Sequence, residues 1–335
     1  SAYLHRLAAR IFEQTCWPLP GPVHINQPFR EPLLPIGEML QATLPEKICI
    51  SWSEQVPSSE AIRALAATIS GRPGFIVCGE LPTEDGFAES VSALAAQLSC
   101  PIFAEPLSNL RFGSHDRSHL CVRYNRWLAD QEFVEKYQPE WILRFGAYPV
   151  TRHLQNYMGS NVVINALVEP CPRWTDPAHR LTHLLRAGPL AVCRALLAEA
   201  PEPTPSDWHA AFAEKEASVH FGNIASHVSV LIEALPENTP VFVGNSLAVR
   251  QLDSESGSGD KRLHFYGNRG ASGIDGNIST AIGIAAAHGR VVALLGDLTC
   301  QHDLGGLALA QGRDVIIVAV NNGGGGIFDL LPQAA

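Results

Sequence analysis

The stretches RVVALLGDL (290–298) and DVIIVAVNNGGGG (314–326) decide the fold of this chain. Each is a short apolar run that ends in polar or glycine residues, which is typical of a buried strand followed by a loop. The residues between them suit a helix, so together they form one strand–helix–strand unit. A right-handed crossover brings the carboxyl ends of the two strands to the same edge of the sheet, where open α/β sheets bind ligands.

The polar ends of these two strands carry the oxygen ligands that magnesium prefers. Asp297 offers a carboxylate, Asn322 an amide oxygen and Gly324 a backbone carbonyl, and two phosphate oxygens and a water would complete an octahedron. The residues after Asp297 open a helix, and glycines 323–326 let the backbone come close to a diphosphate. Alone, Gly-Asp is commonly a helix N-cap and Asn-Gly commonly a turn. Together, at this spacing, they predict a site for magnesium (or manganese) and a diphosphate.

Further apolar runs alternate with helical patterns along the chain, which predicts an α/β fold of doubly wound parallel-sheet domains. Strands are predicted at 47–53, 74–80, 140–146, 161–167, 240–245, 290–297 and 314–322, and helices at 1–17, 84–99, 207–220 and 224–235. Proline-rich segments near 18–35 and 201–207 suggest the boundaries. The predicted parts are the tail of an N-terminal domain with a linker (1–35), a central Rossmann-like domain (36–200) and a diphosphate- and metal-binding domain (201–335).

Composition and charge narrow the class of function. The formal net charge is -9, which argues against a nucleic-acid partner. The sequence has no apolar run of membrane-spanning length and no signal-peptide pattern, so no membrane insertion is expected. Its 8 cysteines are scattered without metal-binding or disulfide spacing, which indicates reduced thiols and a cytoplasmic protein. The chain begins without methionine and stops soon after the glycine-rich loop, so both ends are expected to be cut.

These motifs resemble those of the thiamine-diphosphate enzymes, in which Gly-Asp, about 25 residues and Asn-Asn form a signature. The family usually has glycine after the aspartate, whereas this chain has Leu298 followed by Thr299. One branch of the family is similar over nearly the whole chain, although 36–200 is weakly diagnostic. The matching stretches are GPVHINQPFREPL (21–33), VGNSLAVR (243–250), NRGASGIDGNISTAIGIA (268–285), GDLTCQHDLGGLAL (296–309) and NNGGGGIFDLLP (321–332).

The resemblance implies a cofactor and the residues that hold it. Thiamine diphosphate would bind with its metal at Gly273, Ile274, Gly296, Asp297, Leu298, Thr299, Asn322 and Gly324. Ile274 would prop the cofactor in its bent form. Ile327, Phe328 and Leu331 would form an apolar wall over the reacting centre. Taken singly, Ile274 and the residues of this wall would be ordinary core positions.

The resembling branch consists of transferases of the carboligase type in menaquinone biosynthesis. They decarboxylate 2-oxoglutarate on the cofactor and add the four-carbon carbanion to isochorismate. Both substrates are dicarboxylates, which guanidinium groups bind bidentately. Arg250 and Arg269 stand at the family's matching positions, with Asn245 and Ser246 beside Arg250, and Arg152 is a candidate from a looser match. Any one arginine alone would be a solvated surface residue.

The resemblance also implies parts that this sequence does not contain. Family members activate the cofactor with a glutamate from a domain that would precede Ser1, and they build each site from two subunits of a homodimer or homotetramer. The chain alone is therefore expected to be inactive. Two alternatives stay open. A sister enzyme, such as an acetolactate synthase or another 2-oxo acid decarboxylase, would share the metal motif. A nucleotide- or regulator-binding module is the other, although the central domain has no G-x-G-x-x-G.

Overall fold

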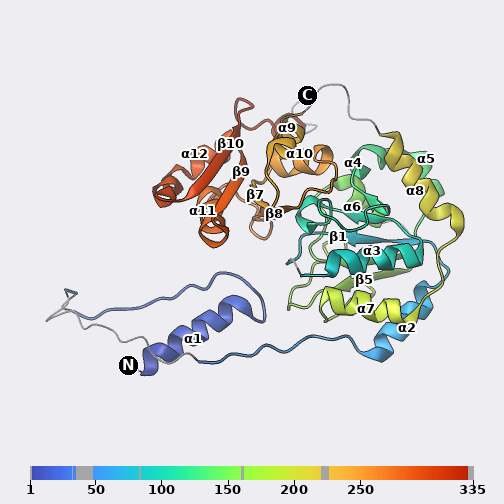
Figure 1. The fold of residues 1–335 in the computed structure, drawn as a ribbon, viewed down its shortest axis with the longest axis horizontal. Helices are drawn as coiled ribbons and strands as arrows, with labels where there is room; N and C mark the ends of the chain where they lie inside the picture. Colours follow the sequence, from blue (N-terminus) through green and yellow to red (C-terminus); the bar gives the residue numbers. More distant parts are fainter. Residues whose placement is uncertain are drawn as a thin grey trace.

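The computed structural model describes residues 2–31, 33–34, 48–82, 84–159, 162–219 and 226–330. Within these ranges the chain forms two parallel sheets with helices packed around them (Figure 1). This confirms the predicted α/β class. The residues around the first sheet (59–218) are called the central unit below, and those around the second sheet (227–330) the C-terminal unit. No helix among the described residues is both long enough and apolar enough to span a membrane.

The first sheet has the strand order β3-β2-β1-β4-β5-β6, and every neighbouring pair is parallel. The order reverses between β1 and β4, as in doubly wound folds. β1, β4 and β5 are buried along their whole length, which explains why they are nearly continuous apolar runs. The strands are β1 (Gly74–Cys78), β2 (Ile102–Ala104), β3 (Leu120–Cys121), β4 (Trp141–Phe145), β5 (Ile164–Val168) and β6 (His183–Leu185).

Helices cover both faces of this sheet. The helical elements of the central unit are α2 (Ser59–Ile69), α3 (Phe87–Leu98), η1 (Pro106–Ser108), α4 (Tyr124–Trp127), α5 (Gln131–Lys136), α6 (Arg152–Met158), α7 (Pro189–Glu199) and α8 (Ser206–Ser218). One core contains residues of α2, α3 and α7, and a second, largely aromatic core contains residues of α4, α6 and α8. Trp208 and Phe212 of α8 are buried in this second core, so α8 packs on the first sheet although it follows the prolines near 201–205.

The second sheet has the order β10-β9-β7-β8 and is also parallel. Val320 of β10 pairs with Gly296 of β9, so the two decisive stretches end side by side as predicted. The strands are β7 (Thr239–Val243), β8 (Leu263–Gly267), β9 (Arg290–Gly296) and β10 (Asp314–Val320). The helical elements are α9 (His227–Ala234), α10 (Leu247–Glu255), α11 (Asn277–His288), α12 (Asp297–His302), η2 (Leu304–Ala310) and η3 (Phe328–Leu330).

Most of the predicted elements are confirmed, and one is wrong. The N-terminal helix forms as α1 (Ala2–Cys16), although none of its residues is buried. The strand predicted at 47–53 does not form: its described part, 48–53, has no regular structure and is mostly exposed. Only the three residues ICI at 48–50 are apolar in succession, and without a neighbouring strand such a run has no ladder to join. The helix predicted at 84–99 forms as α3.

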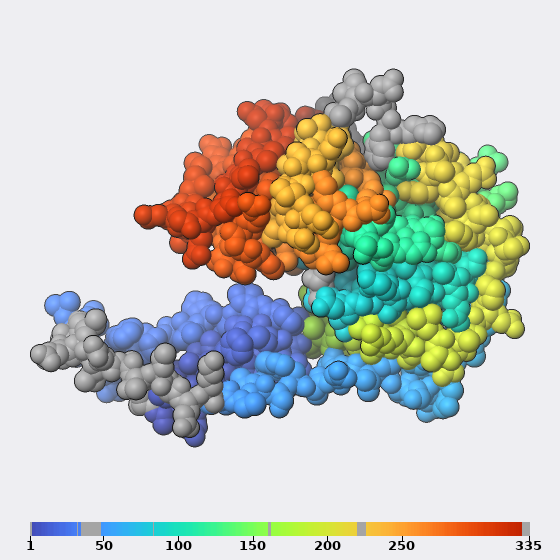
Figure 2. All heavy atoms as spheres, viewed as in Figure 1, coloured from blue at the N-terminus to red at the C-terminus, as the bar shows by residue number. Residues whose placement is uncertain are grey.

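The segment that follows η1 makes contacts between the central and C-terminal units. Figure 2 shows the two units packed directly against each other. The side chain of Asn109 bonds the backbone of Phe265 in both directions, donating to its carbonyl at 3.3 Å and accepting from its N–H at 2.6 Å. Phe112 and Gly259 form a parallel bridge. Arg111, which is fully buried, forms an ion pair with Asp253 of α10. Backbone, amide and charged contacts therefore all cross this boundary.

Glu105, at the end of β2, predicts how stability depends on pH. Burial, and then the charge of Asp253, raise the pKa of Glu105 to about 8 from an ordinary 4.5. Between these pH values the folded chain holds a proton that the unfolded chain releases, so stability falls as pH rises, by about 1.4 kcal/mol per pH unit. Glu105→Gln should remove this slope. The measurement is thermal unfolding from pH 5 to 8, and Glu132→Gln, at an exposed position, is the control. The prediction is contradicted if Glu105→Gln, like the control, keeps the pH slope of the parent protein.

Candidate functional site

A cavity of about 180 Å³ lies at the carboxyl ends of β7, β9 and β10. It collects predicted site residues from four separate stretches of sequence. Those lining it are Asn245, Ser246, Ile274, Gly296, Asp297, Leu298, Thr299, Asn322, Ile327 and Phe328. The parallel sheet explains this convergence, because every strand sends its following loop to the same edge.

Two of the three predicted metal ligands, Asp297 and Asn322, line this cavity from two neighbouring loops. Asp297 is half-buried, and its Oδ1 accepts the N–H of Leu298 at 2.9 Å. Asn322 is exposed, and its Oδ1 lies 3.4 Å from the N–H of Gly326. Within the described ranges no three His, Cys, Asp or Glu side chains come together as a metal-binding group. A cation here would therefore depend on one carboxylate together with amide and backbone oxygens, a donor set that suits a hard ion.

The glycine run after β10 adopts a backbone that other residues rarely take. Gly323, Gly324 and Gly325 have φ values of +82°, +88° and +70°. A Cβ on Gly324 would lie 3.6 Å from the side chain of Leu298, which shows how near this loop comes to the start of α12. Gly324 is not among the residues that line the cavity. The run therefore turns the chain back over the end of β9, where Asp297 begins α12.

The loop that carries Ile274 is held in place by Asn245. Asn245 is buried, and its Nδ2 donates to the carbonyls of Asn268 and Gly273, both at 3.0 Å. Asn277 also donates to the carbonyl of Gly273, at 3.3 Å. Ile274 keeps 36% of its surface exposed and lines the cavity. Ile274 is therefore not among the buried core residues of the described structure, and its role as a prop stays a prediction.

Two of the three residues predicted to form an apolar wall line the cavity. Ile327 is half-buried and Phe328 is 64% exposed, and both line the cavity. Leu331 lies outside the described residues. Ser246 also borders the cavity, with φ +66°, a conformation unusual for a residue with a side chain, and its hydroxyl makes no capping bond to α10. Such strain is characteristic of functional positions.

Two of the predicted arginines lie close enough to repel each other. Arg269 donates to Asn245 Oδ1 at 2.5 Å, and Arg250 donates to the carbonyl of Ser246 at 2.8 Å. Burial, and then the charge of Arg269, lower the pKa of Arg250. In the part of the chain that the structure describes, neither arginine has a carboxylate within ion-pair distance. An anionic ligand would relieve this repulsion.

A larger cavity of about 730 Å³ adjoins the first, because Leu247, Gln251 and Ile327 line both. It lies between the two units, and Arg152 from the start of α6 and Arg250 from α10 both line it. The structure thus brings these two predicted arginines to one hollow.

Gln251 is a candidate that sequence reasoning missed. Its side chain borders both cavities. Leu247 and Gln251 are four positions apart in α10, so helical spacing could have placed them on one face of that helix. A glutamine amide both donates and accepts hydrogen bonds, which makes Gln251 a possible polar contact for a ligand spanning the two cavities.

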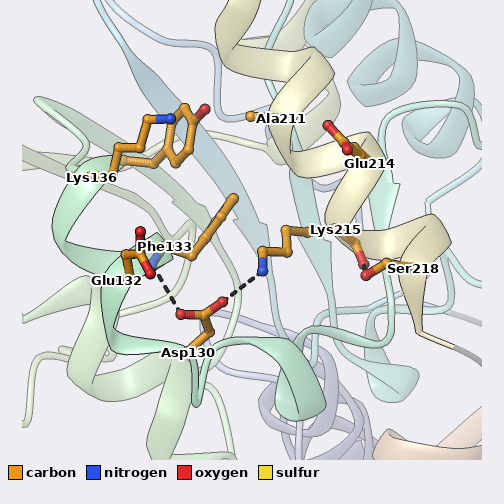
Figure 3. Close-up of a pocket in the computed structure, with 9 residues that line it drawn as sticks. Asp130, Glu132, Phe133, Lys136, Ala211, Glu214, Lys215 and Ser218 are labelled. Atoms are coloured by element: carbon orange, nitrogen blue, oxygen red, sulfur yellow. Dashed lines mark hydrogen bonds and ion pairs between the residues drawn. The ribbon is translucent and has the colours of Figure 1, made fainter.

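A separate hollow of about 360 Å³ lies away from both of these cavities and shares no lining residue with them. It lies between α5 and α8, and Figure 3 shows Lys215 and Asp130 pointing toward each other. Lys215 Nζ lies 2.6 Å from Asp130 Oδ2, and the N–H of Phe133 donates to Asp130 Oδ1 at 3.2 Å. None of the predicted site residues lines it. Lys215 and Asp130 pair with each other, and Glu132, Lys136 and Glu214 also line this hollow.

The fold and the cavity define an α/β protein with a hollow at the carboxyl-end edge of a parallel sheet. No family model matches the sequence. The chain is 60% identical over 331 residues to a 2-succinyl-5-enolpyruvyl-6-hydroxy-3-cyclohexene-1-carboxylate synthase of Dechloromonas aromatica, a match that covers 99% of the chain and 62% of that protein. Synthases with the same name from Geobacillus thermodenitrificans and Geobacillus kaustophilus are 34% and 36% identical, each over 99% of the chain and 60% of their own length. The chain belongs to the family of these synthases, and it spans about three fifths of the length of the curated relatives it matches.

Proposed function

We propose that this chain is the part of a thiamine-diphosphate-dependent synthase that binds the metal and the diphosphate. The whole protein would decarboxylate 2-oxoglutarate and add the four-carbon carbanion to isochorismate, giving 2-succinyl-5-enolpyruvyl-6-hydroxy-3-cyclohexene-1-carboxylate. The supporting observation is the meeting of Asp297, Asn322 and Ile274 in one cavity, beside a second cavity lined by Arg152 and Arg250. The product is the one that the names of the relatives contain.

The residues present fit a divalent cation and a diphosphate. Asp297, Asn322 and the carbonyl of Gly324 would hold magnesium or manganese, and the left-handed glycine backbone leaves room for phosphate oxygens. When bound, the cofactor supplies the nucleophilic carbon and stabilises the carbanion. Gly296, Leu298 and Thr299 would contact the cofactor beside Asp297, and Gly273 would contact it beside Ile274. These roles rest on the placement of the residues and on the resemblance.

The arginines would bind the substrates. Arg250 and Arg269 concentrate positive charge in a chain whose net charge is -9, and Arg152 adds a third cation across the larger cavity. Guanidinium groups orient carboxylates through paired hydrogen bonds. Asn245 accepts a hydrogen bond from Arg269 and donates two to the loop that carries Ile274. Its proposed role is to hold both in place. Ile327 and Phe328, together with Leu331, would exclude water from the reacting carbon.

The proposed organisation extends to domains and assembly. Residues 1–35 would be a tail and linker, followed by a central domain and the diphosphate-binding domain. The packing of α8 in the core of the central unit supports a boundary between α8 and α9. A homodimer or homotetramer in the cytoplasm, with sites shared between subunits, is the proposed state. A sister carboligase would share the metal site, but the relatives' names favour the synthase.

Arginine variants of the complete protein test this function. Arg250→Ala or Arg269→Ala should lower kcat/KM for the dicarboxylate substrates by about ten- to a hundred-fold, because losing a charge-assisted hydrogen bond costs roughly 1.5–3 kcal/mol. Cofactor affinity should barely change. The measurement is the loss of isochorismate in the presence of 2-oxoglutarate, cofactor and magnesium. Arg290→Ala, which removes an exposed ion pair with Asp314 at the start of β9, is the control. Unchanged kinetics in both site variants would exclude these arginines from substrate binding.

A further inference from the structure

Arg111 lies at the centre of a buried network that crosses between the two units. It is fully buried, and it makes five hydrogen-bond contacts. Nε donates to the carbonyl of Ala104 at 2.8 Å, and Nη1 donates to the carbonyl of Asp253 at 2.6 Å and to Ser256 Oγ at 3.1 Å. Nη2 contacts the hydroxyl of Tyr124 and the carboxylate of Asp253. Because the guanidinium is planar, these bonds set both the orientation and the separation of α10 relative to the end of β2.

Tyr124 adds a second contact to Asp253 across the boundary, and Glu105, the residue after Ala104, extends the network within the central unit. The hydroxyl of Tyr124 donates to Asp253 Oδ1 at 2.7 Å, so two groups of the central unit hold one carboxylate of the C-terminal unit. Glu105, the residue after β2, accepts the N–H of Val150 through its side chain. Asp253, Glu105 and Tyr124 are all buried. We call Glu105, Arg111, Tyr124 and Asp253 the inter-unit network.

Each arm of the inter-unit network ends next to an arginine of the larger cavity. Val150, held by Glu105, is two residues before Arg152, which begins α6. Asp253, held by Arg111, is three residues after Arg250, about one turn of α10. A displacement at either contact would therefore move the nearby arginine through a short length of backbone.

We propose that the inter-unit network is a positioning device that sets the separation of Arg152 and Arg250, and with it the geometry in which the cavity receives dicarboxylates. This inference rests on the proposed function. Its four members are positioning residues, because none of them lines either cavity. The alternative is a network that only stabilises the fold. A buried ion pair is weak evidence for stability by itself, whereas its fixed directions suit the alignment of two units.

Asp253→Asn in the complete protein tests the proposal. It keeps the shape of the side chain but removes the charge that Arg111 and Tyr124 share. The KM for at least one dicarboxylate should rise on the order of 10- to 100-fold, as expected when a binding group is misplaced. The cofactor Kd should stay within about two-fold, the usual margin for distant sites. Amide hydrogen exchange should quicken in residues 150–154 and 247–256.

Leu94→Ala is the matched control, because Leu94 is buried in the core shared by α3 and α7, away from the unit boundary. It should lower the Tm without raising KM or quickening exchange in these two segments. If Asp253→Asn does not fold, Tyr124→Phe decides, since it removes one hydroxyl: a KM raised about three-fold or more supports the proposal.

Three results would overturn it. The first is an unchanged KM in the folded variant. The second is an equal rise in KM in Leu94→Ala at an equal loss of Tm. The third is an unchanged KM in Arg250→Ala, which would contradict the proposed function and this inference together. If KM rises in Arg250→Ala but not in Asp253→Asn, only this inference is contradicted.

Discussion

Asp297→Ala in the complete protein is expected to abolish binding of thiamine diphosphate. Among the residues that the structure describes, Asp297 is the one carboxylate that lines the small cavity, where β9 and β10 end side by side. The other proposed ligands are neutral oxygens, so its loss would leave the metal without a charged protein partner. Outer-shell partners of metal sites are worth about 10–100-fold in affinity, and a direct ligand should exceed that range.

Calorimetry with magnesium present measures this effect directly. Asp314→Ala is the matched control, because Asp314 lies at the opposite end of β10 in a half-exposed ion pair with Arg290, which is worth about 0–1 kcal/mol. The control should bind cofactor normally. A cofactor affinity within two-fold of the parent protein in Asp297→Ala would show that the metal assignment is wrong. Omitting magnesium from the parent protein should reproduce the loss that the variant shows.

The part of the fold nearest the proposed metal site was the part that the sequence predicted best. β9 and β10 are seven residues each, and their apolar runs end at Gly296 and Val320, directly before the polar residues. Because parallel strands end at one edge, two motifs 24 positions apart had to meet. The shorter strands β2, β3 and β6 have three residues or fewer, too few for alternation to distinguish them from loops.

The contacts between the two units could not be predicted from the sequence. Arg111 and Asp253 are 142 positions apart, and neither lies in a motif. A lone arginine or aspartate is usually exposed, and the residues that flank it in the sequence do not indicate a buried ion pair. The strand prediction at 47–53 was wrong for the opposite reason. Its local pattern was suitable, but strand formation depends on a partner that local patterns do not reveal.

Ile274→Ala should separate a role in catalysis from a role in packing. Ile274 keeps 36% of its surface exposed and lines the small cavity, whereas Ile278, four residues on, is only 1% exposed in the core of α11. Truncating Ile274 should therefore change the free energy of unfolding by no more than about 0.5 kcal/mol. It should lower kcat on the order of 10- to 100-fold, because a cofactor without its prop would be misaligned for proton abstraction.

The two isoleucines form a matched pair for this measurement. Ile278→Ala should cost about 2–5 kcal/mol of stability, since it opens a cavity in the core, while the folded fraction keeps nearly full turnover. Ile274→Leu should recover most of the activity, because it restores bulk at the same position. The opposite pattern, in which Ile274→Ala is destabilised but turns over normally, would return Ile274 to the role of a packing residue. Both cofactor affinity and single-turnover rates should be recorded, so that weaker binding is not mistaken for slower chemistry.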